Sequence, residues 1–251
     1  MNIHIYFLHY DATNFEKRSR DPNKQRPSWF TYQLCLLNFL KSLNGNCCRG
    51  RVSFTLWYDG SLDKLQFDQD IVNAMEVAQS SGVDVKIMAG NFGSGSKSAY
   101  NLQSHIVGQT SILDDDLVYT LENDYLHQPD WLMKVDELYY SGVQFDYISL
   151  YDHADNYRLP IHRRFISEIF ATSSHIWRTC FSTCYSKLAR GRTMREDHLI
   201  LTRYDDFFAC TMVQLKGRTL VVSTPGLSTH AMSGLESPAV DWGKVATDSI
   251  Y

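Results

Sequence analysis

The sequence predicts an α/β fold in which a mostly parallel central sheet carries helices on both faces. The main observation is that β-rich apolar runs alternate with stretches of helical periodicity through the first 155 residues. The composition, 44% hydrophobic and 21% charged, is that of a folded domain. The 251 residues are enough to bury a sizeable core, and six cysteines are too sparse for a disulfide scaffold. We therefore expect one domain over residues 1–251.

Short apolar runs bounded by polar or glycine residues predict five strands in the first part of the chain. They are Ile3–His9, Val52–Tyr58, Val83–Ala89, Leu117–Leu121 and Tyr147–Tyr151. Apolar residues at helical spacing predict helices between them, over Trp29–Leu43, Asp68–Ser80, Ser98–Val107 and Trp131–Tyr140. The Lys/Arg-rich stretch Asp11–Pro27 is expected to be a loop. This β-α-β order favours parallel pairing.

The alternation weakens after about residue 155. Ser167–Ala171 and Ser174–Trp177 are expected to form a hairpin, and Phe181–Leu188 a short helix. A further helix is predicted over His198–Phe208 and a late strand over Leu220–Ser223, ended by a Pro-Gly pair. Residues 236–251 are polar and are expected to be a tail.

Charge is distributed unevenly along a chain whose formal net charge is −4. Residues 156–218 contain eleven Lys or Arg and five Asp or Glu, whereas residues 1–155 are acidic. A nucleic-acid-binding domain is usually basic as a whole, so this class is disfavoured. The distribution suits a cation site in the first half and anion contacts in the second, although a mixed surface without function explains it equally well.

The first residues read as a strand rather than as a signal peptide, and the chain lacks an apolar run of membrane-spanning length. We therefore expect a cytoplasmic protein with at most peripheral membrane association.

The strand Leu117–Leu121 is followed by Glu122-Asn123-Asp124, two carboxylates two residues apart. Asp11 and Asp59 follow the first two strands, so all of these acids belong at the carboxyl edge of a parallel sheet, where ligands bind. A divalent cation such as Mg²⁺ would offset their repulsion. Ordinary solvated acids at a strand end remain the alternative.

The glycine-rich turn Gly90–Gly95 is followed by Lys97 and Asn101 near the start of a predicted helix, an arrangement that suits a phosphate group. The pattern is neither a P-loop nor the dinucleotide-binding glycine motif. Asp114-Asp115-Asp116 precedes a strand, so it is expected to be a turn at the opposite edge.

Three further segments contain acidic residues or a histidine that could take part in chemistry. Glu196 and Asp197 open a predicted helix, where carboxylates are favoured by the helix dipole, but either could serve as a general base. The Asp205-Asp206 pair is interpreted as a solvated helix face. His230 follows the last strand and is a candidate third metal ligand, although a lone histidine is more often structural.

Together, these segments resemble the nucleotide-sugar glycosyltransferases of the GT-A fold, in particular the inverting, family-2-like group, over about residues 3–232. The resemblance rests on six segments in order: the first strand with Tyr10-Asp11, Trp57-Tyr58-Asp59-Gly60, Gly93–Asn101, Val118–His127, Arg195–His198 and Pro225–His230.

The resemblance implies a nucleotide-sugar half over about residues 1–127 and an acceptor half over about 128–235. It assigns Asp124 and His230 to the metal, Mn²⁺ or Mg²⁺, and Asp197 to the catalytic base, with Glu196 as its competitor. The nucleotide-binding residues that we take from the resemblance and from the phosphate-binding pattern are Tyr10, Asp11, Asp59, Lys97, Asn101, Glu122 and Asn123. The family motif has Asp where this chain has Glu122.

The implied activity is metal-dependent transfer of a sugar from a nucleoside-diphosphate donor, UDP by family frequency, to a hydroxyl of a glycan or glycolipid. Such a reaction serves polysaccharide biosynthesis, and direct displacement with Asp197 as base would invert the anomeric carbon. Two alternatives stay open: a nucleotidyltransferase acting on sugar phosphates, and a non-catalytic nucleotide- or glycan-binding module.

Overall fold

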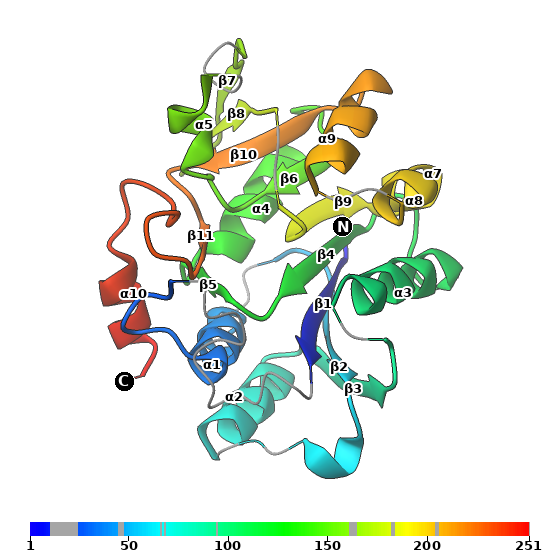
Figure 1. Ribbon diagram of the computed structural model, residues 1–251, viewed down its shortest axis with the longest axis vertical. Helices are drawn as coiled ribbons and strands as arrows, with labels where there is room; N and C mark the ends of the chain where they lie inside the picture. The colour runs from blue at the N-terminus through cyan, green and yellow to red at the C-terminus, as the bar shows by residue number, and fades with distance from the viewer. Residues whose placement is uncertain are drawn as a thin grey trace.

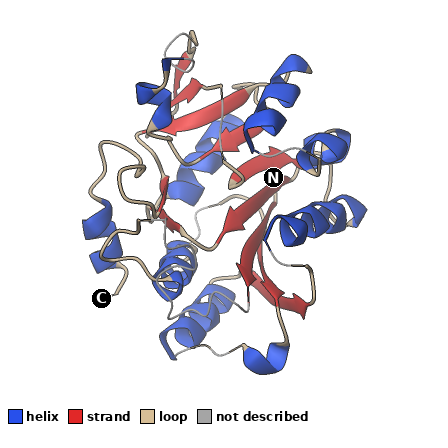
Figure 2. Ribbon diagram, viewed as in Figure 1, coloured by secondary structure: helices blue, strands red, loops and turns tan. Residues whose placement is uncertain are grey.

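The computed structural model describes residues 1–10, 25–44, 48–65, 67, 69–93, 95–160, 165–181, 184–203 and 206–250, apart from the side chains of residues 206 and 207. It is an α/β fold with a large mixed sheet flanked by helices on both faces (Figures 1 and 2). The sheet has nine strands in the order β3-β2-β1-β4-β9-β6-β10-β8-β7. The predicted α/β class, with a central sheet that carries helices on both faces, is therefore confirmed.

The first four strands of the sheet are parallel, as the sequence predicts. They are β1 (Ile3–Tyr10), β2 (Val52–Asp59), β3 (Asp84–Gly90) and β4 (Leu117–Glu122). Tyr10 pairs in register with Asp59, and Asp59 with Gly90. Glu122 pairs with Leu8, two residues before the end of β1. These strand ends consequently meet at one edge.

The second half of the chain adds strands of both directions. They are β6 (Tyr147–Ser149), β7 (Ile169–Ala171), β8 (Ile176–Thr179), β9 (Lys187–Arg190) and β10 (Leu220–Thr224). β9 lies between β4 and β6 and runs antiparallel to both, so β6 keeps the direction of β4. The predicted β7–β8 hairpin is confirmed.

The helix predicted over Phe181–Leu188 is wrong, because Lys187 and Leu188 begin strand β9. Leu188 packs into the core on one face of the sheet and Ala189 into the core on the other. β9 has only two apolar residues, Leu188 and Ala189, and a run that short cannot be distinguished from a helical turn by periodicity.

Helices cover the two faces of the sheet. One face packs against α1 (Tyr32–Ser42), α2 (Gln69–Ser80), α4 (Trp131–Tyr140) and α10 (Trp242–Asp248). The other face packs against α3 (Gly95–Gly108), α7 (Gly191–Glu196), α8 (His198–Leu201) and α9 (Asp206–Leu215). Shorter turns form at η2 (Leu62–Lys64) and α5 (Asp155–Arg158). None of the helices within the described ranges combines the length and apolar character needed to cross a bilayer.

Two further predictions about helices are wrong. The single helix over His198–Phe208 is two helices, because α8 ends at Leu201 and α9 begins at Asp206. The expected tail contains α10, in which Asp241 caps the Lys244 amide and Trp242 is buried in the core. One large apolar side chain fixes this segment although its neighbours are polar.

A small second sheet lies beside the carboxyl edge. It pairs β5 (Tyr125–His127) with β11 (Ser228–His230) in antiparallel register, with His230 opposite Tyr125. Figure 1 shows both strands beside α1 and α10. This pairing brings the late part of the chain back to the residues that follow β4.

Candidate functional site

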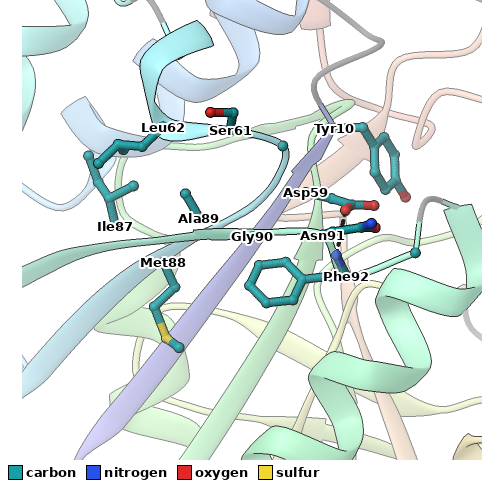
Figure 3. Close-up of a pocket in the computed structure, with 12 residues that line it drawn as sticks. Tyr10, Asp59, Ser61, Leu62, Ile87, Met88, Ala89, Gly90, Asn91 and Phe92 are labelled. Atoms are coloured by element: carbon teal, nitrogen blue, oxygen red, sulfur yellow. Dashed lines mark hydrogen bonds between the residues drawn. The ribbon is translucent and has the colours of Figure 1, made fainter.

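A cleft of about 1140 Å³ opens at the ends of β1, β2 and β3. Tyr10 and Asp59 border it together with the stretch after β3 (Figure 3). Asp59 accepts a hydrogen bond from the Phe92 amide at 2.7 Å, and the Phe92 ring stacks on Trp57 with centroids 3.8 Å apart. These contacts tie the loop after β3 to the end of β2 and so define one wall of the cleft.

Tyr10 also borders a second cavity, of about 290 Å³, on the α3 face of the sheet. Glu122 and Lys187 contribute charged groups to this cavity. Its other lining residues are Gly95, Ser96, Ala99, Tyr100, Gln103, Tyr185, Leu201 and Ala209. Burial, followed by the charges of Glu122, Asp124 and Asp59, raises the pKa of Tyr10, so its hydroxyl stays protonated.

Asp124 and His230 are brought together, as the sequence argument expects. His230 Nε2 lies 3.0 Å from Asp124 Oδ2, and its ring stacks on Tyr125. The Ala231 amide donates to the Asp124 carbonyl oxygen at 2.8 Å, which fixes the two strands at this point.

Arg26 is a third member of this cluster. Its Nη2 lies 2.7 Å from Asp124 Oδ2, and its Nη1 donates to the Ala231 carbonyl oxygen at 2.6 Å. Burial would raise the pKa of Asp124, but His230 and Arg26 outweigh it and hold that pKa well below its usual range. Burial would likewise lower the pKa of His230, yet the Asp124 carboxylate raises it.

Asn123 turns away from the two cavities. Its side chain is buried and contacts His9 Nδ1 at 2.7 Å on the α1 face of the sheet. The resemblance places it at the nucleotide, whereas the geometry gives it a supporting position between Glu122 and Asp124.

Lys97 and Asn101 lie on the exposed side of α3. The side-chain amide of Asn101 donates a hydrogen bond to the Phe92 carbonyl oxygen at 2.7 Å. The stem of Lys97 lies over Gly93, where an added Cβ would come within 2.7 Å of it, and Gly93 has a φ of +96°. Both residues therefore shape the loop beside the first cleft.

Asp197 and Glu196 are not brought to this edge. Asp197 is fully buried near the start of β6, where it accepts hydrogen bonds from Tyr147 (2.7 Å), Lys216 (2.5 Å) and Arg218 (2.9 Å). Burial would raise the pKa of Asp197, but the hydrogen bonds from Arg218, Lys216 and Tyr147 lower it. Glu196 is paired with Arg218. This arrangement is a buried ion-pair network rather than an open base.

Asp11 and Asp205 lie outside the described residues, and so does the side chain of Asp206. The Asp114–Asp116 segment is confirmed as a turn at the opposite edge, where Asp116 accepts from the amides of Leu113 and Asn2.

Sequence reasoning missed Arg26 and Lys187. Arg26 falls in the basic stretch before α1, which carries no periodic signal, and Lys187 falls in the strand that was predicted to be a helix. Lys187 lies between Ser186 and Leu188, so no sequence pattern predicts its burial.

The described residues supply only part of a coordination shell for a metal ion. Within the described ranges, no three His, Cys, Asp or Glu side chains gather closely enough to hold one. Asp124 Oδ1 is nevertheless buried without a hydrogen-bond partner in the part of the chain that the structure describes. That oxygen and His230 are suitable ligands for a cation that completes its shell with waters or substrate oxygens.

No family model matches the chain, and a search of curated proteins also gives no match.

Proposed function

We propose that this chain is a metal-dependent glycosyltransferase of GT-A type, which transfers a sugar from a nucleoside-diphosphate donor, UDP by preference, to a hydroxyl of a glycan or glycolipid. One observation carries the proposal. Tyr10, Asp59, Glu122 and the Asp124–His230 pair converge at the carboxyl ends of parallel strands, beside a cleft large enough for a nucleotide. That edge is where open α/β sheets bind ligands.

In this proposal the nucleoside occupies the cleft after β2 and β3. The Tyr10 ring offers a flat surface to the base, and the Asp59 carboxylate, which the Phe92 amide holds in place, suits ribose hydroxyls. The diphosphate then extends along the edge toward Glu122 and Asp124.

Asp124 and His230 would hold the cation. Asp124 Oδ1 supports this assignment, because it is buried, no described residue hydrogen-bonds to it, and leaving a buried carboxylate oxygen unpaired is costly. When bound, a divalent cation neutralises the charge that develops on the leaving diphosphate. The ring stacking of His230 on Tyr125 orients its Nε2 toward Asp124.

Asp197 is left out of this mechanism. Both of its oxygens accept from Arg218 or its neighbours, and its pKa is lowered, so it is a poor acceptor for the proton of an acceptor hydroxyl. Inversion, which rested on Asp197 as base, is therefore not part of the proposal.

A non-catalytic nucleotide-binding module is the second candidate. The observation that favours it is the Arg26–Asp124 ion pair, which already neutralises the carboxylate assigned to the metal. Turnover with a panel of donor sugars separates the two candidates.

The decisive experiment titrates UDP, GDP, CMP and dTDP into the protein with and without Mn²⁺. We expect Mn²⁺ to tighten the binding of one diphosphate, and we expect this gain to be lost in Asp124→Asn and retained in Asp84→Asn, an exposed control. A folded protein that binds none of the four would refute the proposed function. Binding that is the same with and without Mn²⁺ would refute its metal-dependence.

A further inference from the structure

The cavity between α3, β4 and β9 contains a buried lysine, Lys187, that forms no salt bridge with the described residues. Lys187 is only 6% exposed, and its ammonium group lies 5.3 Å from the Tyr185 ring centroid. Among the described residues, no carboxylate lies within ion-pairing distance of its Nζ. Burying an ammonium group without an anion is unfavourable, and a cation–π contact offsets only part of that cost. An anionic ligand in the cavity would remove the remainder.

The N-terminus of helix α3 adds positive potential to this cavity. Gly95 and Ser96, in the first turn of the 14-residue helix α3, line it. The amides of a first helical turn lack intrahelical partners, and the helix dipole adds positive potential there. Lys187 and this helix terminus thus line one cavity from two elements, β9 and α3.

The remaining polar groups of the cavity suit hydroxyls. Gln103 is 1% exposed, and its Oε1 has no hydrogen-bond partner in the described part of the chain. Its Nε2 donates to the Tyr185 hydroxyl at 3.2 Å. Glu122 contributes a carboxylate to the same lining, and Tyr100 and Tyr10 add two phenols. An anion with an attached polyol matches this combination of groups.

Tyr10 links the cavity to the larger cleft, since it lines both. We propose that Lys187, with the first turn of α3, binds the diphosphate of the donor, and that the sugar lies against Gln103 and Glu122. This inference rests on the proposed function, because it assigns the phosphate and sugar positions of that same donor. It adds a protein cation to the charge neutralisation assigned above to the metal.

The test replaces Lys187 with Met, which keeps the length of the side chain and removes its charge. Inorganic pyrophosphate and UDP are titrated calorimetrically in buffer containing EDTA, so that no divalent cation contributes. Loss of one charge-assisted contact is expected to weaken both ligands by about 10- to 100-fold. Tm should stay the same or rise, because an uncompensated buried charge has been removed.

Lys86→Met is the matched control, because Lys86 is an exposed lysine on β3. Its affinities should equal those of the wild type. Unchanged pyrophosphate and UDP affinity in Lys187→Met would overturn the assignment, as would a wild type that binds no pyrophosphate. A lowered Tm with unchanged affinity would make Lys187 purely structural.

Two further binding measurements distinguish a failure of this inference from a failure of the proposed function. If Lys187→Met weakens pyrophosphate but the wild type binds none of the four nucleotides, the anion site stands and the proposed function falls. If the loss is confined to UDP-glucuronate and absent for UDP and UDP-glucose, the contact is to a sugar carboxylate and the diphosphate assignment is overturned.

Discussion

Arg26 and Asp124 form a buried ion pair, with 2.7 Å between Nη2 and Oδ2 and side chains only 6% and 9% exposed. The guanidinium also lies over the Phe30 ring, 4.5 Å from its centroid. Arg26 therefore places a full positive charge on the carboxylate that the proposed function assigns to a cation. Two positive species that share one carboxylate compete, because each lowers the local negative potential that attracts the other.

This competition predicts that Arg26→Gln binds Mn²⁺ more tightly than the wild type. We expect a gain of about tenfold, equivalent to about 1.4 kcal/mol, since the cation no longer displaces a buried partner of Asp124. The affinity is measured from the free Mn²⁺ signal in electron paramagnetic resonance. Arg49→Gln, which removes an exposed arginine, is the control. Equal or weaker binding in Arg26→Gln would show that Arg26 supports the site instead of competing for it.

Asp59 is predicted to act on the nucleoside rather than on the metal. Asp59→Asn keeps an oxygen that can accept from the Phe92 amide but loses the charge. We expect uridine and UDP to lose affinity by a similar factor, about tenfold, with or without Mn²⁺. Isothermal titration of both ligands checks this. A loss seen with UDP only in the presence of Mn²⁺ would move Asp59 to the metal instead.

Asp197 is predicted to stabilise the fold rather than to catalyse. Asp197→Asn leaves Arg218 and Lys216 without their shared carboxylate, and breaking a buried pair costs about 3 kcal/mol. Because the native pKa is lowered, this contribution is present above the unfolded-state pKa of about 3.9 and is lost as pH falls through the native value. Urea unfolding at pH 7 measures the loss.

The control for Asp197 is Asp114→Asn, which removes a mostly exposed partner of Arg195 and should change stability by less than about 1 kcal/mol. UDP affinity should be the same in both variants. If Asp197→Asn were as stable as the wild type and yet lost turnover, the original assignment of Asp197 as the base would be restored.

The fold and the edge of the site could be read from the sequence because they depend on local signals. The strands at Val52 and Leu117 end in acids, and parallel pairing puts strand ends together. The same local reading could not tell that Asp197 is enclosed. Its partners Tyr147, Lys216 and Arg218 lie at least nineteen residues away in the chain, and their approach is a product of tertiary packing.

Arg26 and Lys187 show why the rest of the site escaped prediction. Each is a lone basic residue whose environment is decided by a different segment: Asp124 for Arg26, and α3 with Tyr185 for Lys187. Charge patterns describe the surface of a helix or strand, but they do not show which charge becomes buried.

His127 gives a pH-dependent prediction that is independent of function. It is fully buried, its Nε2 lies 2.7 Å from the Tyr119 hydroxyl, and burial lowers its pKa to about 3. An unfolded histidine titrates near 6.5, so between pH 6.5 and 3 the unfolded chain binds a proton that the native chain excludes. Stability should therefore fall with decreasing pH, by as much as about 1.4 kcal/mol per pH unit from this residue.

His127→Gln should remove that dependence, because glutamine is neutral throughout and can still hydrogen-bond to Tyr119. Urea unfolding at pH 7, 6 and 5 gives the change of the unfolding free energy with pH for each protein. Because these slopes are compared, a lower stability of the variant at pH 7 does not affect the result. His198→Gln, which removes an imidazole outside the core, should keep the wild-type slope. An unchanged slope in His127→Gln would mean that the acid sensitivity of the fold resides in other groups and that His127 takes up its proton without unfolding.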